Sequence, residues 1–585
     1  MKKLAFLLFL SSSITTIAQH DHHVDDSKTG SSGHSHLAHM LASRAQNFYI
    51  HNLPAPKLMK NIGASYMKIE TKSDSCQKYF NQGLNLLHDF WDFEAYRAFK
   101  EAIRLDSSAI MPYWGLYQMP GPDDDSVLKA SKKNAIKQIK KLLKKANEHE
   151  KLYGEITILS DSLKEKADEE IFKKMDYLIH KFPEDVDAKL FLALGKMAGF
   201  DTEKKPMEGQ MYSEFLLKEV QRLEPNNHGF HHYWIHLMED CCPEKALPSA
   251  DILTSLAPYS GHIVHMPGHI YNRVGDYKRA HDSFVAAVKT DSTYMKTEGI
   301  QEVDNWNYIH NINYLINNSA HDGRHNEALF YAEKLKNMTV NKDRKKIYQG
   351  TFFNQGILAP ARMEMAFGNW EKASAQFELV NNKDSVYKFG QMEYKNALQI
   401  FTQGMDAISK NKLMEAIQFS NSLDALLWRN QNQTGKDSTM GKWLQSTLNT
   451  ASLELQGNIL IEKGEFAEAL KLLKKAEKQE IDLGYGEPPL YARPVAFSIA
   501  RMHEKEAKID KSIEKYLELL KRFPKSAMIY FELLKNYKTK GDLEKINEFE
   551  TKLKEAATYA DSDMYKLEKK EIIEKNKVIK KKLKN

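Results

Sequence analysis

Small residues recur along this chain with a fixed spacing, and that spacing constrains the fold more than any other feature. In FNQGLNLLHDFWDFEAYRAFKEAIRLD, steps of twelve, four and three residues lead from Gly83 to Ala95, Phe99 and Ala102. Small residues at such places allow two short helices to cross closely, and the larger apolar residue fills the seam to the next pair. The same steps connect two further sets, Gly268, Ala280, Phe284 and Ala287, and Gly457, Ala469, Leu473 and Ala476.

This pattern resembles the tetratricopeptide repeat (TPR), whose unit carries G-x2-Y, then A-x3-F and often a later proline. The resemblance covers most of residues 75–560 and implies an all-α fold, a right-handed α-solenoid of helix-turn-helix repeats. Runs of alternating β-branched residues that would indicate strands are almost absent. Weaker copies of the pattern occur at Ala246, Ala250 and Pro258, at Ala373 and Phe377, at Gly404 and Ala416, and at Tyr516 and Pro524.

The segments that flank the repeats differ from them in composition. Lys2 and Lys3 precede an apolar run that is too short to span a membrane, which is typical of a secretory signal peptide. The next segment is rich in Ser, Gly, Asp and His and predicts a flexible leader, and the end of the chain predicts a solvated basic tail. We therefore expect a signal peptide at 1–18, a His-rich leader at 19–70, N-terminal repeats at 71–225, central His-lined repeats at 226–340, C-terminal repeats at 341–560 and the tail at 561–585.

Charge and cysteine content narrow the functional classes. The chain has 84 Lys and Arg against 78 Asp and Glu, a near balance that does not indicate a nucleic-acid partner. No later apolar run is long enough for a transmembrane segment, and no lipobox cysteine lies near the cleavage point, so we expect a periplasmic or secreted protein. The three cysteines, Cys76, Cys241 and Cys242, form no disulfide framework. A bridge from Cys76 to one of the other two stays an open alternative.

Histidines concentrate in the middle of the repeats. Of 22 histidines, seven lie in the leader and eleven lie between His228 and His325. A helix advances about 100° per residue, so the three histidines of GHIVHMPGHIY share one face. The histidines of NHGFHHYWIH also share one helix face, with His236 at the margin of that face. The repeat frame places a set of histidines on the first helices of three successive pairs: His228, His231, His262, His265, His269 and His310.

In the TPR family these places line the concave groove in which extended peptides dock. The resemblance therefore implies that these six histidines form a ligand groove for a protein or peptide. The alternative from the residues alone is that the imidazoles hydrogen-bond across the seam between repeats.

The same cluster is a candidate metal site, because imidazole nitrogen binds zinc, copper and nickel. Besides Glu239, Asp240 is a candidate carboxylate ligand of the metal, and Cys241 is a candidate soft ligand. Pro267 lacks an amide donor, so we expect it to interrupt or kink its helix and to aim His265 and His269 at different angles. The candidate ligand set for one transition-metal ion is His228, His231, His232, His262, His265, His269 and His310, with Glu239. Within the leader, QHDHHVDD and HSHLAHM would bind such ions weakly, or are incidental composition.

A second resemblance concerns particular motifs. The segments HHYWIHLME, GHIVHMPGHIY and GYGEPPLYARPV resemble an uncharacterised group of secreted TPR proteins with H-x-Y-I-H, GH-x-x-HMP-x-HIY and GEPP motifs. This chain departs from the pattern at Tyr491 and Ala492, where an aromatic pair is usual, and in having Cys241 and Cys242 in the turn. The resemblance implies a shared site without naming its chemistry.

Motifs of known enzymes are missing from the sequence. His232 and His236, like His265 and His269, have the spacing of an HExxH zinc motif, but Tyr233 and Met266 stand where the glutamate is needed. The sequence therefore favours a protein without enzymatic activity. It predicts an exported TPR scaffold that binds a protein or peptide partner, with a His-coordinated metal. One alternative is a periplasmic metal-binding protein, and another is an accessory component of envelope uptake or polysaccharide degradation with a glycan ligand.

Overall fold

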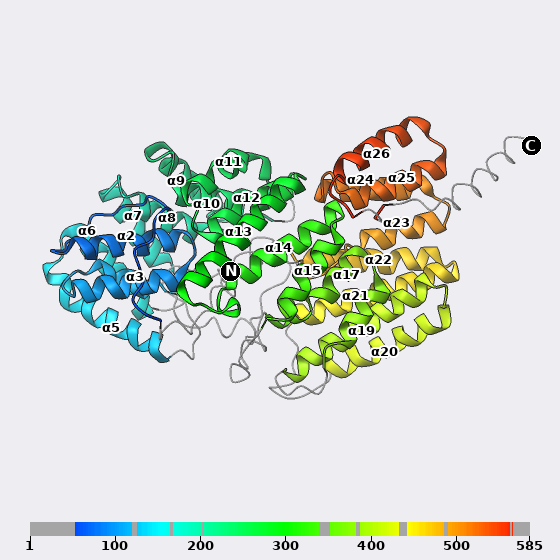
Figure 1. Ribbon diagram of the computed structural model, residues 1–585, viewed down its shortest axis with the longest axis horizontal. Coiled ribbons are helices and arrows are strands. Elements are labelled where there is room, and N and C mark those ends of the chain that lie inside the picture. Colours follow the sequence, from blue (N-terminus) through cyan, green and yellow to red (C-terminus); the bar gives the residue numbers. More distant parts are fainter. Residues whose placement is uncertain are drawn as a thin grey trace, which may run out of the picture. The chain divides into compact units, whose positions relative to one another are not determined.

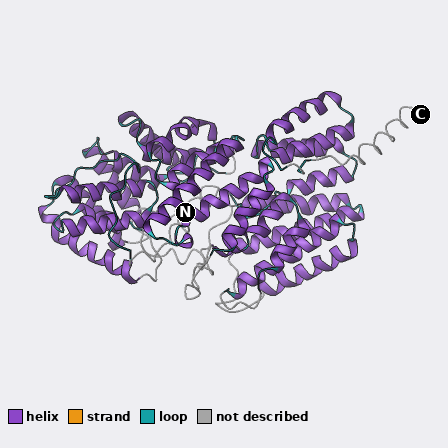
Figure 2. Ribbon diagram, viewed as in Figure 1, coloured by secondary structure: helices purple, strands orange, loops and turns teal. Residues whose placement is uncertain are grey.

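The structure is a computed structural model that describes residues 53–119, 126–163, 168–201, 204–338, 352–381, 387–431, 442–484, 489–561 and 564–565. Over these residues the chain is helical (Figure 1; Figure 2), and the β-type pairing recorded there is an isolated bridge between Phe200 and Pro206. The prediction of an all-α fold of repeated helical pairs is confirmed. Consecutive helices pack on each other as pairs, for example α2 on α3 and α21 on α22.

The chain separates into two compact units. The first contains the described residues within Met1–Tyr271, Asp282–Asn311 and Gly484–Glu487, and the second contains those within Asn272–His281, Ile312–Leu483 and Pro488–Asn585. Helices α12, α13 and α14 contribute residues to both units.

The helices that build the first unit run from α2 to α14. Their bounds are α2 (Asp74–His88), α3 (Asp92–Leu105), α4 (Met111–Gln118), α5 (Ser126–Leu142), η3 (Leu143–Lys145), α6 (Glu148–Leu163), α7 (Asp168–Lys181), α8 (Val186–Lys196), α9 (Gln210–Leu223), α10 (His228–Met238), η5 (Pro243–Ala246), α11 (Leu247–Leu256), α12 (Gly261–Arg273), α13 (Tyr277–Glu298), η6 (Glu302–Asp304) and α14 (Trp306–Asp322).

The remaining helices belong to the second unit. Their bounds are α15 (His325–Lys336), η7 (Phe353–Ile357), α17 (Ala359–Phe367), α18 (Trp370–Glu378), α19 (Phe389–Ser409), α20 (Leu413–Gln431), α21 (Lys442–Lys463), α22 (Phe466–Asp482), α23 (Ala496–Lys505), α24 (Ile509–Arg522), α25 (Ala527–Lys540) and α26 (Leu543–Ala556). Among the described helices, none is both long enough and apolar enough to cross a membrane.

The small residues of the repeat pattern lie where helices cross. A Cβ atom on Gly83 of α2 would lie 2.6 Å from the ring of Phe99 on α3, and one on Gly115 of α4 would lie 2.4 Å from the same ring. Phe99 therefore fills the seam between one pair and the next, as the spacing predicts. Gly268 of α12 lies against Phe284 of α13 in the same way, with a Cβ-to-ring distance of 2.3 Å.

The predicted leader differs from the structure over its last part. The backbone N–H of Met59 donates to Gln82 Oε1 at 2.7 Å, and that of Ser65 donates to Asn85 Oδ1 at 2.9 Å. These bonds hold Met59 and Ser65 along α2, within the segment that the sequence predicts to be flexible. Residues 1–52, with the predicted signal peptide and the leader histidines, lie outside the described residues, as do residues 566–585 of the tail and residues 486–488 of the GEPP motif.

The cysteines pair differently from the alternative weighed on the sequence. Cys241 and Cys242 are joined by a disulfide bond, and Cys76 is a buried free thiol. Cys76 therefore forms no bridge to Cys241 or Cys242. While it is disulfide-bonded, Cys241 does not offer a thiolate ligand.

Candidate metal centre

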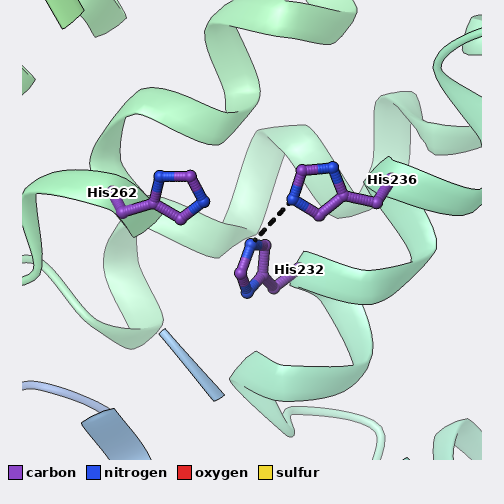
Figure 3. A group of neighbouring side chains, drawn as sticks. All are labelled: His232, His236 and His262. Atoms are coloured by element: carbon purple, nitrogen blue, oxygen red, sulfur yellow. Dashed lines mark hydrogen bonds between the residues drawn. The ribbon is translucent and has the colours of Figure 1, made fainter. Parts of the chain in front are cut away.

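Six histidines from three helices meet inside the first unit. α10 supplies His232 and His236, α12 supplies His262, His265 and His269, and α14 supplies His310. Between 0% and 6% of each residue is exposed. They form triad 1, His232, His236 and His262 (Figure 3), and triad 2, His265, His269 and His310, and in each triad one ligand atom per residue lies within 4.8 Å of the others.

Local helix geometry explains why these side chains meet. His232 and His236 lie four residues apart on α10, as His265 and His269 do on α12, so each pair stacks on adjacent turns of one face. α12 continues from Gly261 to Arg273 with Pro267 inside it, so the expected interruption is wrong. The Nε2 atoms of His265 and His269 lie 2.5 Å apart, so the two rings converge on one point.

Each imidazole of triad 1 uses its Nδ1 atom to contact a fixed hydrogen-bond partner. His232 Nδ1 lies 2.6 Å from the backbone oxygen of His88, which can only accept, so this nitrogen carries the proton. His236 Nδ1 lies 3.1 Å from Glu239 Oε1. His262 Nδ1 lies 3.1 Å from Asn307 Oδ1. Three acceptors from three parts of the chain therefore set the tautomers of triad 1.

The orientation of Asn307 follows from its own partner. Its amide nitrogen donates to Asp291 Oδ2 at 2.9 Å, which turns its oxygen toward His262. Asn311 Nδ2 donates to the same oxygen of Asp291 at 2.7 Å. Burial raises the pKa of Asp291 to about 7, against the effect of the asparagine amides, which donate to it.

With Nδ1 protonated, a neutral imidazole presents a lone pair at Nε2. The Nε2 atoms of His232 and His236 lie 3.1 Å apart. Two nitrogens that bind one ion at about 2.0–2.1 Å with an angle near tetrahedral are themselves roughly 3.3 Å apart. The spacing of this pair is therefore that of two ligands on one metal ion.

Triad 2 has a related arrangement. His269 Nδ1 lies 2.7 Å from Glu239 Oε2, so its Nε2 atom faces that of His265. The ring of His310 lies 4.8 Å from that of His265, centroid to centroid. At 2.5 Å the two Nε2 atoms are closer than two ligands of one ion, and they must separate by about 0.8 Å to hold it.

Glu239 connects the triads without joining either of them. It directly follows α10, is buried, and places Oε1 against His236 and Oε2 against His269. We expected this carboxylate as a metal ligand, and the structure instead directs both its oxygens at imidazole Nδ1 atoms. This is the carboxylate–histidine arrangement that orients metal ligands in proteins.

Burial keeps two of these imidazoles neutral. It lowers the pKa of His232 well below its usual value of 6.5, and the neighbouring imidazoles lower it further. Burial has the same effect on the pKa of His265, again with a contribution from neighbouring histidines. The neutral imidazole is the form that binds metal.

Aromatic side chains cover triad 1. The ring of Phe90 lies 4.5, 5.6 and 5.7 Å from those of His232, His236 and His262, centroid to centroid. Phe90 has a φ of 56°, a left-handed conformation that is unfavourable for a bulky residue. The turn after α2 is therefore held in an uncommon shape that places this ring over the triad.

Two predicted ligands lie outside the triads. His231 contacts Ser249 Oγ with Nδ1 and the Pro225 backbone oxygen with Nε2, both at 2.9 Å. His228 Nε2 lies 3.3 Å from Asp89 Oδ1. The structure therefore gives both residues other neighbours than the triads.

The predicted groove also differs from the structure. The six residues expected to line it are buried, so they do not offer an exposed surface to a peptide: His228, His231, His262, His265, His269 and His310.

His236 belongs to triad 1 but lies outside the predicted ligand set, although its spacing from His232 is a usable signal. Asn307 and the backbone of His88 have no such signal, because contacts across 45 and 144 residues leave no periodic pattern in the sequence.

Comparisons with known proteins add little about this site. No protein-family model matches the chain, and neither does any curated protein. Among solved structures, a human IFIT1 dimer with m7Gppp-AAAA is 14% identical, with coverage of 84% of this chain and 92% of that chain and a TM-score of 0.31. Yeast Tom70 is 13% identical, with coverage of 82% and 89% and a TM-score of 0.25. Similarity this low supports no inference about ligands or partners.

Proposed function

We propose that this chain is a helical-repeat metalloprotein that binds a transition-metal ion through the Nε2 atoms of His232, His236 and His262. The observation that carries the proposal is the 3.1 Å approach of the Nε2 atoms of His232 and His236, whose Nδ1 atoms each face an acceptor. The two Nε2 atoms are hydrogen-bonded to each other when one of them carries a proton. When that proton leaves, both present lone pairs that a cation between them can bind.

The donor set favours particular ions. Three neutral imidazoles suit zinc, copper and nickel rather than magnesium or calcium, which prefer oxygen. Three protein ligands also leave a coordination position for water or another small ligand. Phe90 above the triad and the fixed Nδ1 partners would limit exchange of the ion with solvent.

Burial favours metal binding over the peptide scaffold. A peptide that docks on the histidine-lined helices needs accessible imidazoles, and these are at most 6% exposed. We propose an exported location as well, on the basis of the apolar segment that follows Lys2 and Lys3.

The test is the metal content of the full chain, purified without chelator and without an affinity His tag. The leader histidines are replaced by Gln in every sample to remove background binding: His20, His22, His23, His34, His36, His39 and His51. His262→Ala should lose the ion bound at triad 1, whereas His231→Gln, a change at a buried histidine outside the triads, should retain it. Circular dichroism checks that helicity persists. An unchanged metal content in His262→Ala with intact helicity would disprove the proposal.

A further inference from the structure

We propose that His265, His269 and His310 form a second transition-metal site, and that Glu239 couples it to the first, so that the interior of this unit holds a two-ion centre. This inference rests on the proposed function, because it adds a second ion beside the ion of triad 1.

More imidazole nitrogens converge in this unit than one ion can bind. Six buried imidazoles lie in contact, and one ion at triad 1 accounts for three of them. A four-coordinate ion has no place for the other three. In triad 2, whose residues lie on α12 and α14, one ligand atom per residue also lies within 4.8 Å of the others. The Nδ1 atom of its His269 faces a carboxylate oxygen of Glu239, as that of His236 does.

The two triads lie close together. His262 of triad 1 stacks on His265 of triad 2 with ring centroids 5.8 Å apart, and His236 lies 6.2 Å from His269. Two ions held by rings that lie this close together would repel each other in a buried place unless anions lie close to them. Glu239 supplies a negative charge against both triads.

The geometry of the two triads predicts which of them binds an ion first. In triad 1 the Nε2 atoms of His232 and His236 already have the spacing of two ligands, whereas those of His265 and His269 must move apart. Triad 1 therefore binds first and more tightly. An ion there fixes His236 and with it the carboxylate that orients His269, so the first ion prepares the second site.

The experiment is a titration of the full chain, with the leader histidines replaced by Gln as above, with Zn²⁺ alone. Equilibrium dialysis and elemental analysis give the number of ions per chain and their affinities. The background protein should bind two equivalents with unequal affinity. His310→Ala should lose the weaker equivalent, His262→Ala the tighter one, and the double variant both. His231→Gln serves as the matched control, and circular dichroism verifies folding of each variant.

The outcomes separate this inference from the proposed function. One equivalent that His262→Ala removes and His310→Ala retains would overturn the second site and leave the first. One equivalent removed by either change would mean a single ion shared by both triads, which also overturns the second site. One equivalent that depends on His310 and not on His262 would overturn both proposals, as would no zinc at all or two equivalents in every variant.

Coupling through Glu239 has its own readout. Glu239→Gln keeps the shape of the side chain but replaces one acceptor oxygen by a donor and removes the charge. Both zinc affinities should fall by about ten- to a hundredfold, which is typical for loss of such a partner. A loss confined to one triad would overturn the coupling while leaving two independent sites.

Discussion

Glu239 Oε2 lies 2.7 Å from Nδ1 of His269, thirty residues further along the chain, while its Oε1 lies 3.1 Å from Nδ1 of His236. One buried carboxylate therefore sets the tautomer of an imidazole in each triad. In both rings Nδ1 faces the carboxylate, and Nε2 faces the Nε2 atom of a second histidine on the same helix. This relationship supports the proposal that the cluster is a metal centre rather than a set of unrelated buried histidines.

Asn307→Ala should weaken zinc binding at triad 1 by about ten- to a hundredfold, because it removes the acceptor that orients His262. Competition with a chromophoric chelator measures the affinity. Asn318→Ala is the matched control, since Asn318 is also a buried asparagine of α14 and donates to the backbone of Tyr277. An equal loss of affinity in both variants would show that the effect is a general weakening of α14.

Phe90→Ala should speed the release of zinc from triad 1 by about tenfold, because the ring that covers the three imidazoles is gone and water reaches the ion. Stopped-flow transfer of zinc to an excess of chelator gives the rate. Phe230→Ala controls for the loss of a buried ring on α10, since Phe230 packs on His231 and Trp234. Release at the same rate in Phe90→Ala and the unsubstituted protein would contradict this role.

Gly268→Ala should destabilise the first unit by about 1–3 kcal/mol, because a Cβ atom there would lie 2.3 Å from the ring of Phe284. The change lies between His265 and His269, so zinc affinity at triad 2 should fall with stability. Thermal unfolding followed by circular dichroism measures the first effect. Gly195→Ala is a milder comparison, with its nearest atom at 3.0 Å, and should cost less.

A contact is predictable from the sequence when the two residues lie close together along the chain. The helical pairs follow from Gly83, Phe99 and their counterparts, because the crossing needs a small residue at a fixed step from a large one. The pairing of His265 with His269 follows from four-residue spacing within one helix. Their burial was not predictable, because it depends on residues distant in sequence: the ring of His310 lies 4.8 Å from that of His265, and Glu239 contacts His269.

The continuity of α12 through Pro267 shows a second limit. Proline removes one backbone donor and crowds the preceding turn, so an isolated helix tends to break there. Here the neighbouring residues Met266 and Gly268 are buried against other helices, and packing keeps the helix intact. Tertiary contacts therefore decide a feature that local preference alone predicts wrongly.

His321 in the second unit predicts a pH effect that is independent of metal. Its ring lies between those of Tyr277 and Phe523, at 4.9 and 4.8 Å, and burial lowers its pKa from 6.5 to about 4. Below pH 6.5 the unfolded chain binds a proton that the folded chain takes up only near pH 4. The stabilisation from a neutral His321 is thus complete above pH 6.5 and is lost as the pH falls to about 4.

The loss attributable to His321 amounts to up to about 3 kcal/mol. His321→Gln should therefore flatten the fall in melting temperature between pH 6.5 and pH 4. His180→Gln provides a comparison at another helical histidine, and an identical acid dependence in His321→Gln and the unsubstituted protein would contradict the assignment.

The most direct test of the metal centre is an anomalous difference map, recorded at the zinc absorption edge, from crystals of the full chain grown with Zn²⁺. We predict a peak at about 2.0–2.1 Å from the Nε2 atoms of His232, His236 and His262. No peak at this triad in zinc-containing crystals, with the three imidazoles ordered as they are here, would contradict the claim that the buried histidines form a metal site.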